Sequence, residues 1–188
     1  SSERTARSTH FEPVTLLSAL AAVTSRIGLV ATTSTSFNEP YNVARRFASL
    51  DHLSGGRAGW NLVTSATDAE AANFGGDRIA RHANRYERAE EFVDVVLGLW
   101  NTWDDGAVII DRASGQFSKP DGFRPLNHRG SHFEVRGPLN ISRTPQGQPV
   151  LVQAGSSGPG KDLAARTAEI VFTANQTLEE AVAFYGDL

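Results

Sequence analysis

The sequence has 188 residues and a formal net charge of −3, from 18 Lys and Arg residues against 21 Asp and Glu residues. This length can bury the core of one domain, and the near-neutral charge gives no reason to expect a nucleic-acid or anionic-membrane partner. Cysteine is absent, which excludes disulfides, thiolate metal sites and cysteine nucleophiles. No apolar run reaches about 18 residues, so no transmembrane helix is predicted.

Methionine is also absent. Removal of the initiator together with chance would explain this, but we expect the chain to be an internal piece of a longer protein. The last residues, TLEEAVAFYGDL, agree with that expectation because the helix they begin stops without a C-cap signal.

The first third of the chain predicts one strand–helix–strand unit. In chain order we expect a helix over 13–25, a strand over 27–33, a helix over 40–53 and a strand over 57–63. Pro40 opens the second helix and Gly55 ends it. Strands joined in this way are parallel with a right-handed crossover, and ligands bind at the C-terminal ends of such strands.

The middle of the chain predicts a long helix followed by an excursion. Residues 66–77 are polar and contain glycine, so we expect a loop over the strand ends. Residues 80–103 carry apolar side chains at helical spacing and predict one helix. Residues 104–148 are rich in Gly, Pro and charged residues, and we expect them to carry a β-hairpin rather than form a separate domain.

The alternation of strands and helices then resumes. We expect a strand over 149–154, a loop over 155–160, a helix over 161–167, a strand over 169–173 and a last helix capped by Thr177 with Glu180. This makes four parallel strands, whereas an α/β barrel needs eight strands and about 250 residues. The sequence therefore predicts the central part of a single (β/α)8 TIM-barrel domain.

The glycine-rich segment QAGSSGPGKD (153–162) is the clearest candidate ligand loop. It follows a strand and opens a helix, so backbone amides and the hydroxyls of Ser156 and Ser157 could bind an anion such as a phosphate. Asp162 stands where a Walker A loop needs Ser or Thr. An ordinary strand-to-helix turn is the alternative interpretation.

His82 and Tyr86 lie four residues apart, on one face of the predicted long helix. Both side chains can donate hydrogen bonds to a phosphate or to a sugar hydroxyl. A surface histidine beside a core tyrosine is the alternative. No nearby carboxylate completes a metal-ligand set with this pair, and the other histidines show no metal-binding spacing, so no metal site is predicted.

Two polar residues of the strand over 57–63 and its end are further candidates. Asn61 lies within an apolar strand and must be hydrogen-bonded, either by a ligand or by neighbouring backbone. Ser65 follows the strand end, where it could reach a substrate or reactive intermediate, and is the one catalytic candidate. Alternatively it caps the next segment.

Four segments together resemble the bacterial-luciferase-like flavin monooxygenases, most closely the branch of nitrilotriacetate, EDTA and dibenzothiophene-sulfone monooxygenases. They are residues 12–65, RHANRYERAEEF at 81–92, residues 117–140 and PVLVQAGSSGPG at 149–160. The resemblance implies a cytoplasmic TIM-barrel enzyme that uses FMN, supplied as FMNH2 by a separate flavin reductase. O2 is the co-substrate and adds to the flavin, giving a peroxyflavin that oxygenates a small organic molecule.

The resemblance also implies roles for individual residues. A hydroxyl at the end of the strand over 27–33, placed at Thr33, would contact the flavin, and Asn61 would lie near the flavin ring. The ribityl-phosphate end would be bound by His82, Tyr86, Ser156 and Ser157.

Family members exceed 400 residues, so two strands before this chain and two after it are expected to complete the barrel. The isolated piece is expected to be inactive, and the full-length protein to be a homo-oligomer. A non-catalytic half-barrel binding module and a deazaflavin (F420)-dependent oxidoreductase are the alternatives. The sequence does not indicate the substrate.

Overall fold

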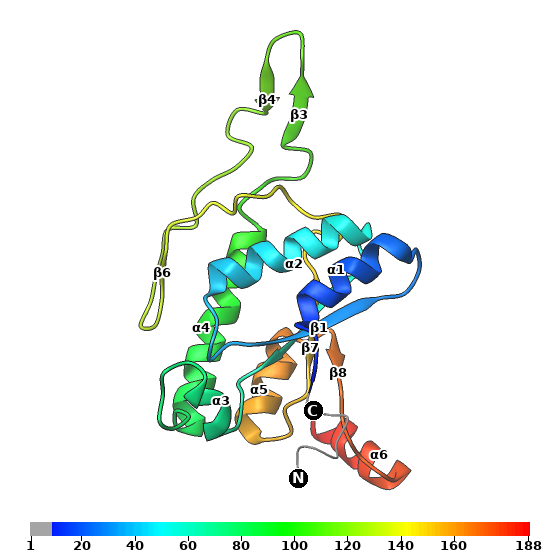
Figure 1. Ribbon diagram of the computed structural model, residues 1–188, viewed down its shortest axis with the longest axis vertical. Helices are drawn as coiled ribbons and strands as arrows, with labels where there is room; N and C mark the ends of the chain where they lie inside the picture. Colours follow the sequence, from blue (N-terminus) through cyan, green and yellow to red (C-terminus); the bar gives the residue numbers. More distant parts are fainter. Residues whose placement is uncertain (1–8) are drawn as a thin grey trace.

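The computed structural model describes residues 9–188, and its centre is a four-stranded sheet in the order β1-β2-β7-β8 (Figure 1). Every neighbouring pair in this sheet is parallel. The strands are β1 (Leu29–Ser34), β2 (Ala58–Val63), β7 (Val150–Gln153) and β8 (Ile170–Val171). The four predicted parallel strands are confirmed, although β8 has only two residues.

Six helices accompany the sheet within the described residues, and four of them contribute buried side chains to the main core. The helices are α1 (Pro13–Val23), α2 (Pro40–Ser54), α3 (Asp68–Ala72), α4 (His82–Trp100), α5 (Gly158–Thr167) and α6 (Leu178–Asp187). Among the residues described, no helix combines the length and apolar character needed to cross a membrane.

The boundaries of α2 follow from its terminal residues. Pro40 occupies the first turn, where its missing N–H costs no helical hydrogen bond. Gly55 adopts the left-handed conformation at φ 68°, and its amide donates to the carbonyls of Asp51 and His52. Glycine takes this conformation at little cost, so the helix ends where the sequence predicts.

The main core lies between the sheet and helices α2 and α4. Trp60 of β2 is fully buried there, with its ring centroid 5.9 Å from those of Phe47 and Phe92 and 6.4 Å from that of Trp100. Each such aromatic pair adds about 0.5–1.5 kcal/mol beyond its buried area. Trp60 and Trp100 are therefore core residues. Leu53, near the end of α2, is by contrast 64% exposed.

The opposite face of the sheet is lined by alternate residues of each strand. Val30 and Thr32 of β1 are exposed on this face, and Thr32 pairs in register with Asn61 of β2. In a closed α/β barrel this face points into the barrel interior, where layers of side chains fill it.

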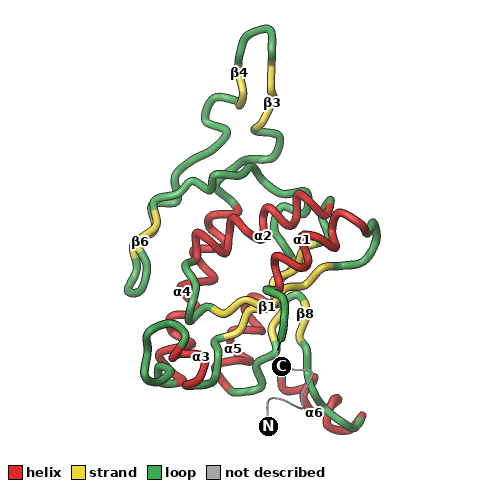
Figure 2. Tube along the Cα trace, viewed as in Figure 1, coloured by secondary structure: helices red, strands yellow, loops and turns green. Residues whose placement is uncertain are grey.

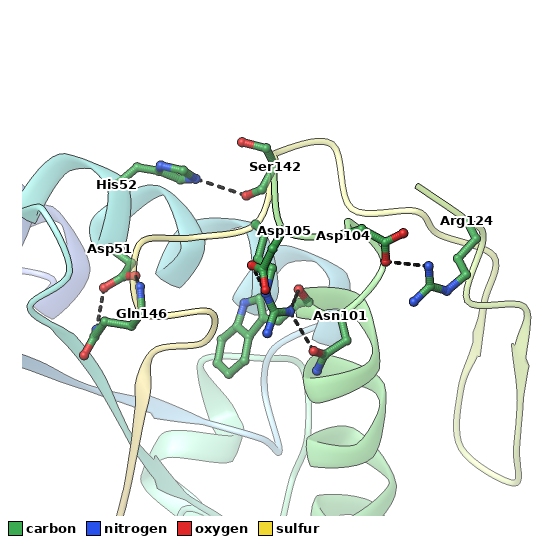
Figure 3. Close-up of polar contacts among 10 residues, drawn as sticks. Asp51, His52, Asn101, Asp104, Asp105, Arg124, Ser142 and Gln146 are labelled. Carbon is green, nitrogen blue, oxygen red and sulfur yellow. Dashed lines mark hydrogen bonds and ion pairs between the residues drawn. The ribbon is translucent and has the colours of Figure 1, made fainter. Parts of the chain in front are cut away.

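Asp51 fastens the end of α2 to the start of β2. It is fully buried and accepts hydrogen bonds from the amides of Ala58 and Gln146, each at 3.2 Å, and from the Gln146 side chain. His52 meets the carbonyl of Ser142 at 3.0 Å (Figure 3). These contacts tie residues 142–146 to the body of the molecule, so Asp51 has a structural role.

The segment between α4 and β7 contains two small antiparallel pairs where one hairpin was predicted. They are β3 (Val108–Asp111) with β4 (Gln116–Ser118), and β5 (His128–Arg129) with β6 (Glu134–Val135). Loop dominates the remainder of this segment (Figure 2). The β3–β4 hairpin projects beyond α2, at the end of the molecule opposite α3 and α5 (Figure 1).

The prediction of a loop over 66–77 is wrong in part, because helix α3 forms within these residues. The hydroxyl of Thr67 accepts from the amide of Glu70 and so caps α3. The Thr-x-x-Glu spacing is the N-terminal signal that the loop interpretation overlooked. Similarly, α5 begins at Gly158 rather than Lys161, because Ser157 is its N-cap.

Candidate functional site

A pocket of about 220 Å³ lies at the C-terminal ends of β2 and β7, the edge predicted to bind a ligand. It is bounded by the end of β2, by the start of α4 and by the loop that follows β7. The lining residues are Leu62, Val63, Thr64, Ser65, Ala66, Tyr86, Gln153, Ala154 and Gly155. Two of the predicted site residues, Ser65 and Tyr86, therefore share one cavity.

Asn61 carries an unused acceptor. Its Nδ2 donates to Oγ1 of Thr32 at 2.9 Å, whereas its Oδ1 is buried and has no hydrogen-bond partner among the described residues. A buried polar atom left unpaired costs about 1–3 kcal/mol. The Nδ2 of Asn61 is thus paired within the chain, whereas its Oδ1 can accept a hydrogen bond from a ligand.

Thr33 points to the face of the sheet opposite that of Thr32 and Asn61. It is in register with the buried Leu62, and its carbonyl accepts from the Trp60 indole at 3.0 Å. Successive strand residues point to opposite faces, so the hydroxyl that shares the face of Asn61 belongs to Thr32. The flavin contact predicted at Thr33 stays a prediction, and Thr32 is the neighbouring hydroxyl on the face of Asn61.

Ser65 has a positive φ of 58°, a conformation uncommon for residues other than glycine. Its Oγ donates to Oε1 of Glu70 at 2.7 Å and lies 2.6 Å from Oγ of Ser34. Ser65 does not cap the next helix, because Thr67 does. Glu70 was not predicted as a site residue, because only the fold of α3 brings it to Ser65.

The start of α4 presents the predicted His82–Tyr86 pair. The two ring centroids are 4.7 Å apart, with Tyr86 buried against the pocket and His82 exposed. Arg85 is half-buried, and its Nε has no partner among the described residues, while its Nη1 donates to the carbonyl of Ala80. A cationic group with an unused donor next to this pair suits an anion.

The loop after β7 brings Ser157 close to Tyr86 around a glycine. A Cβ added to Gly160 would lie 2.9 Å from Oη of Tyr86 and 3.1 Å from Oγ of Ser157. It would also lie 3.1 Å from Cα of Gly155. Only glycine therefore leaves the two hydroxyls undisturbed on either side of the backbone.

Gln153 was not among the predicted site residues, although it lines the pocket. It is 2% exposed, and its Oε1 accepts from the amide of Gly155, which fixes the turn into the glycine-rich loop. Its position as the last residue of an otherwise apolar strand was the available signal. Ser156 is exposed and does not line the pocket. Within residues 9–188, no group of three His, Cys, Asp or Glu side chains is arranged to hold a metal ion.

Comparison with known proteins identifies the family. The model of the luciferase-like monooxygenase family matches residues 2–188. The chain belongs to the luciferase-like monooxygenase family. The predicted resemblance is confirmed, and with it the α/β TIM-barrel fold class.

Curated relatives of this luciferase-like chain lie within the predicted branch. It is 60% identical over 177 residues to N-acetyl-S-(2-succino)cysteine monooxygenase of Bacillus subtilis, covering 94% of this chain and 40% of the relative. Nitrilotriacetate monooxygenase component A of Aminobacter aminovorans is 60% identical over 177 residues, with 94% and 39% covered. The chain thus spans about 40% of the length of these relatives.

Solved structures of the same family superpose closely on this luciferase-like chain. The crystal structure of a long-chain alkane monooxygenase gives a TM-score of 0.91 at 39% identity, over 96% of this chain and 42% of that one. A riboflavin lyase, solved with modified FMN and its substrate riboflavin, gives 0.89 at 37% identity, over 95% and 40%. The four-stranded sheet described above is therefore the family's arrangement.

Proposed function

We propose that the full-length protein is an FMNH2-dependent monooxygenase of a two-component system that oxygenates a small organic molecule. Family membership supports the oxygenase class, and the relative named component A supports supply of reduced flavin by a separate reductase. The observation that carries the proposal is the pair of features on this side of the sheet: the unpaired Oδ1 of Asn61, and the close approach of Tyr86 and Ser157 around Gly160.

The polar groups at this edge fit the two ends of FMN. A flavin ring carries N–H donors, and Asn61 holds an unpaired acceptor on the barrel-facing side of β2. A phosphate carries acceptors only, and the hydroxyls of Tyr86 and Ser157 offer donors near the start of α5. Arg85, one residue before Tyr86 on α4, adds a positive charge with an unpaired Nε. His82 and Ser156 would contribute from the exposed rim.

Bound reduced flavin supplies the electrons that activate O2, which no side chain of this chain can provide. The protein's own part is to bind and orient the cofactor. The buried wall formed by Leu62 and Tyr86 keeps water from one side of the pocket. Ser65 lies where it could contact the cofactor or the substrate, and Asn61 fixes the ring orientation.

Ser157→Asp in the full-length protein tests the phosphate end. Aspartate is an effective N-cap, so α5 should be preserved, but its carboxylate would face the phosphate at close range. We expect the dissociation constant for FMNH2, measured by anaerobic titration, to rise at least about tenfold.

Thr177→Asp is the matched control, because it converts the N-cap of α6 in the same way and lies outside the pocket lining. Equal affinities of the two variants for FMNH2 would remove Ser157 from the proposed cofactor site.

A further inference from the structure

Ser65 is the middle member of a chain of hydrogen bonds that joins the loops after β1 and β2 to α3. The amide of Ser36 donates to Oγ of Ser34 at 3.1 Å, and Ser34 Oγ lies 2.6 Å from Ser65 Oγ. Ser65 Oγ then lies 2.7 Å from Oε1 of Glu70.

The direction of each bond in this chain is fixed by chemistry. An ionised carboxylate only accepts hydrogen bonds, and a hydroxyl has one proton to donate. The proton of Ser65 therefore goes to Glu70, and the proton of Ser34 goes to Ser65. Towards the pocket, Ser65 has an acceptor lone pair and no proton to donate.

The backbone around Ser65 holds the hydroxyl in place. Oγ of Ser36 donates to the carbonyl of Thr64 at 2.6 Å, and the amide of Thr35 donates to the carbonyl of Val63 at 2.8 Å. These two hydrogen bonds on one side and Glu70 on the other hold Ser65 in its left-handed conformation. Such conformations persist when the surrounding contacts over-determine them, and they cluster at ligand sites.

We propose that Glu70 is a positioning residue, which takes the Ser65 proton and so presents Ser65 to the reduced flavin as a hydrogen-bond acceptor only. The flavin group that meets Ser65 is then a donor, an N–H or an O–H. This inference rests on the proposed function, and it gives Ser65 an accepting role towards the cofactor.

Glu70→Gln in the full-length protein replaces the carboxylate acceptor of the Ser65 proton by a neutral amide with little change of shape. The amide oxygen accepts more weakly than a carboxylate, and the amide NH2 can turn towards Ser65 Oγ, so the Ser65 proton is released to face the flavin donor. We expect the dissociation constant for FMNH2 to rise roughly fivefold to twentyfold. The oxygenation rate at saturating flavin should change little, because the lost contact is a binding contact.

Two further variants separate positioning from support of the fold. Glu179→Gln makes the same change on the exposed face of α6 and should leave the affinity unchanged. In a Ser65→Ala background, Glu70→Gln should change the affinity less than about twofold, because the group through which it acts is gone.

An equal loss of affinity in the presence and absence of the Ser65 hydroxyl would overturn the proposal, since Glu70 would then act only by holding α3. An unchanged affinity of Glu70→Gln would overturn it as well. Failure of the unaltered protein to bind FMNH2 at all would instead contradict the proposed function, and the inference with it.

Discussion

Glu91 is the residue that holds the β5–β6 hairpin against α4. Its carboxylate accepts from His128 Nε2 and from the amides of His132 and Phe133, all at 2.9 Å. Burial raises the pKa of Glu91, but the hydrogen bonds from His128 and the two amides outweigh burial and lower the pKa below its ordinary value of 4.5.

A lowered folded-state pKa gives stability that is fully present above the unfolded-state pKa and is lost as the pH falls through the folded-state value. We therefore expect Glu91→Gln to reduce the free energy of unfolding at pH 7 by about 1–3 kcal/mol. The difference from the unaltered protein should shrink as the pH falls below 4.5. Urea unfolding of the full-length protein at pH 7 and at acidic pH measures both.

Glu134→Gln serves as the control for this measurement. Glu134 lies on the same hairpin and pairs with Arg129, but both side chains are exposed. The change should cost less than about 1 kcal/mol. A Glu91→Gln effect no larger than that of Glu134→Gln would show that the hairpin does not depend on the carboxylate.

At the residue scale, the sequence predicts the site as far as side-chain type and local spacing decide it. The i, i+4 spacing of His82 and Tyr86 places both at the start of α4, as the structure has them. The choice between Thr32 and Thr33 depends on strand register, which a run of three hydroxyl residues leaves ambiguous. Glu70 was missed because its partner Ser65 is reached only through the fold of α3.

At the scale of elements, the β3–β4 hairpin is an arm without contact to the site. It follows the C-terminal end of α4, whereas the site lies at the N-terminal end, and 19 helical residues span about 28 Å. Ile109, Ile110 and Phe117 of the arm are 41–59% exposed. The arm therefore adds little to the core of this chain.

Replacing residues 109–117 by an Asn-Gly turn between Val108 and Ser118 tests this separation. We expect the affinity of the full-length protein for FMNH2 to change less than about twofold, because no pocket residue is altered. Trp103→Ala is the comparison variant at the base of the arm. It removes a stacked contact with Phe123, whose ring centroid lies 4.5 Å away, and should lower the melting temperature more than shortening the arm does. A shortened arm that weakens FMNH2 binding tenfold would place the arm in the site.

Element boundaries follow the sequence where a terminal residue determines them. Pro40 and Gly55 delimit α2, and the Thr177–Glu180 capping box opens α6. Within residues 104–148 apolar side chains are sparse and the strands are two to four residues long. Periodicity is not measurable over such lengths, so only one of the two hairpins was predicted.

At the scale of the whole molecule, the site depends on parallel strands that all end at one edge. Asn61 lies on β2 and Ser65 just after it, Tyr86 lies on α4, and Ser157 lies in the loop after β7. Of these residues, Ser65 and Tyr86 line the pocket. Right-handed crossovers place every following loop at that edge. The common edge at which the four strands end could thus be predicted from the sequence, while the close approach of Tyr86 to Gly160 could not.

The central claim is that reduced FMN binds across this edge, with its phosphate between α4 and α5. Anaerobic titration of FMNH2 into the full-length protein and its Gly160→Ala variant tests it most directly. Alanine suits a helix, but its methyl group would lie 2.9 Å from Oη of Tyr86 and 3.1 Å from Oγ of Ser157. We predict that the unaltered protein binds FMNH2 more tightly than reduced coenzyme F420, and that Gly160→Ala weakens FMNH2 binding at least about tenfold. No binding of FMNH2 to the unaltered protein, or equal affinity in the variant, would contradict the account.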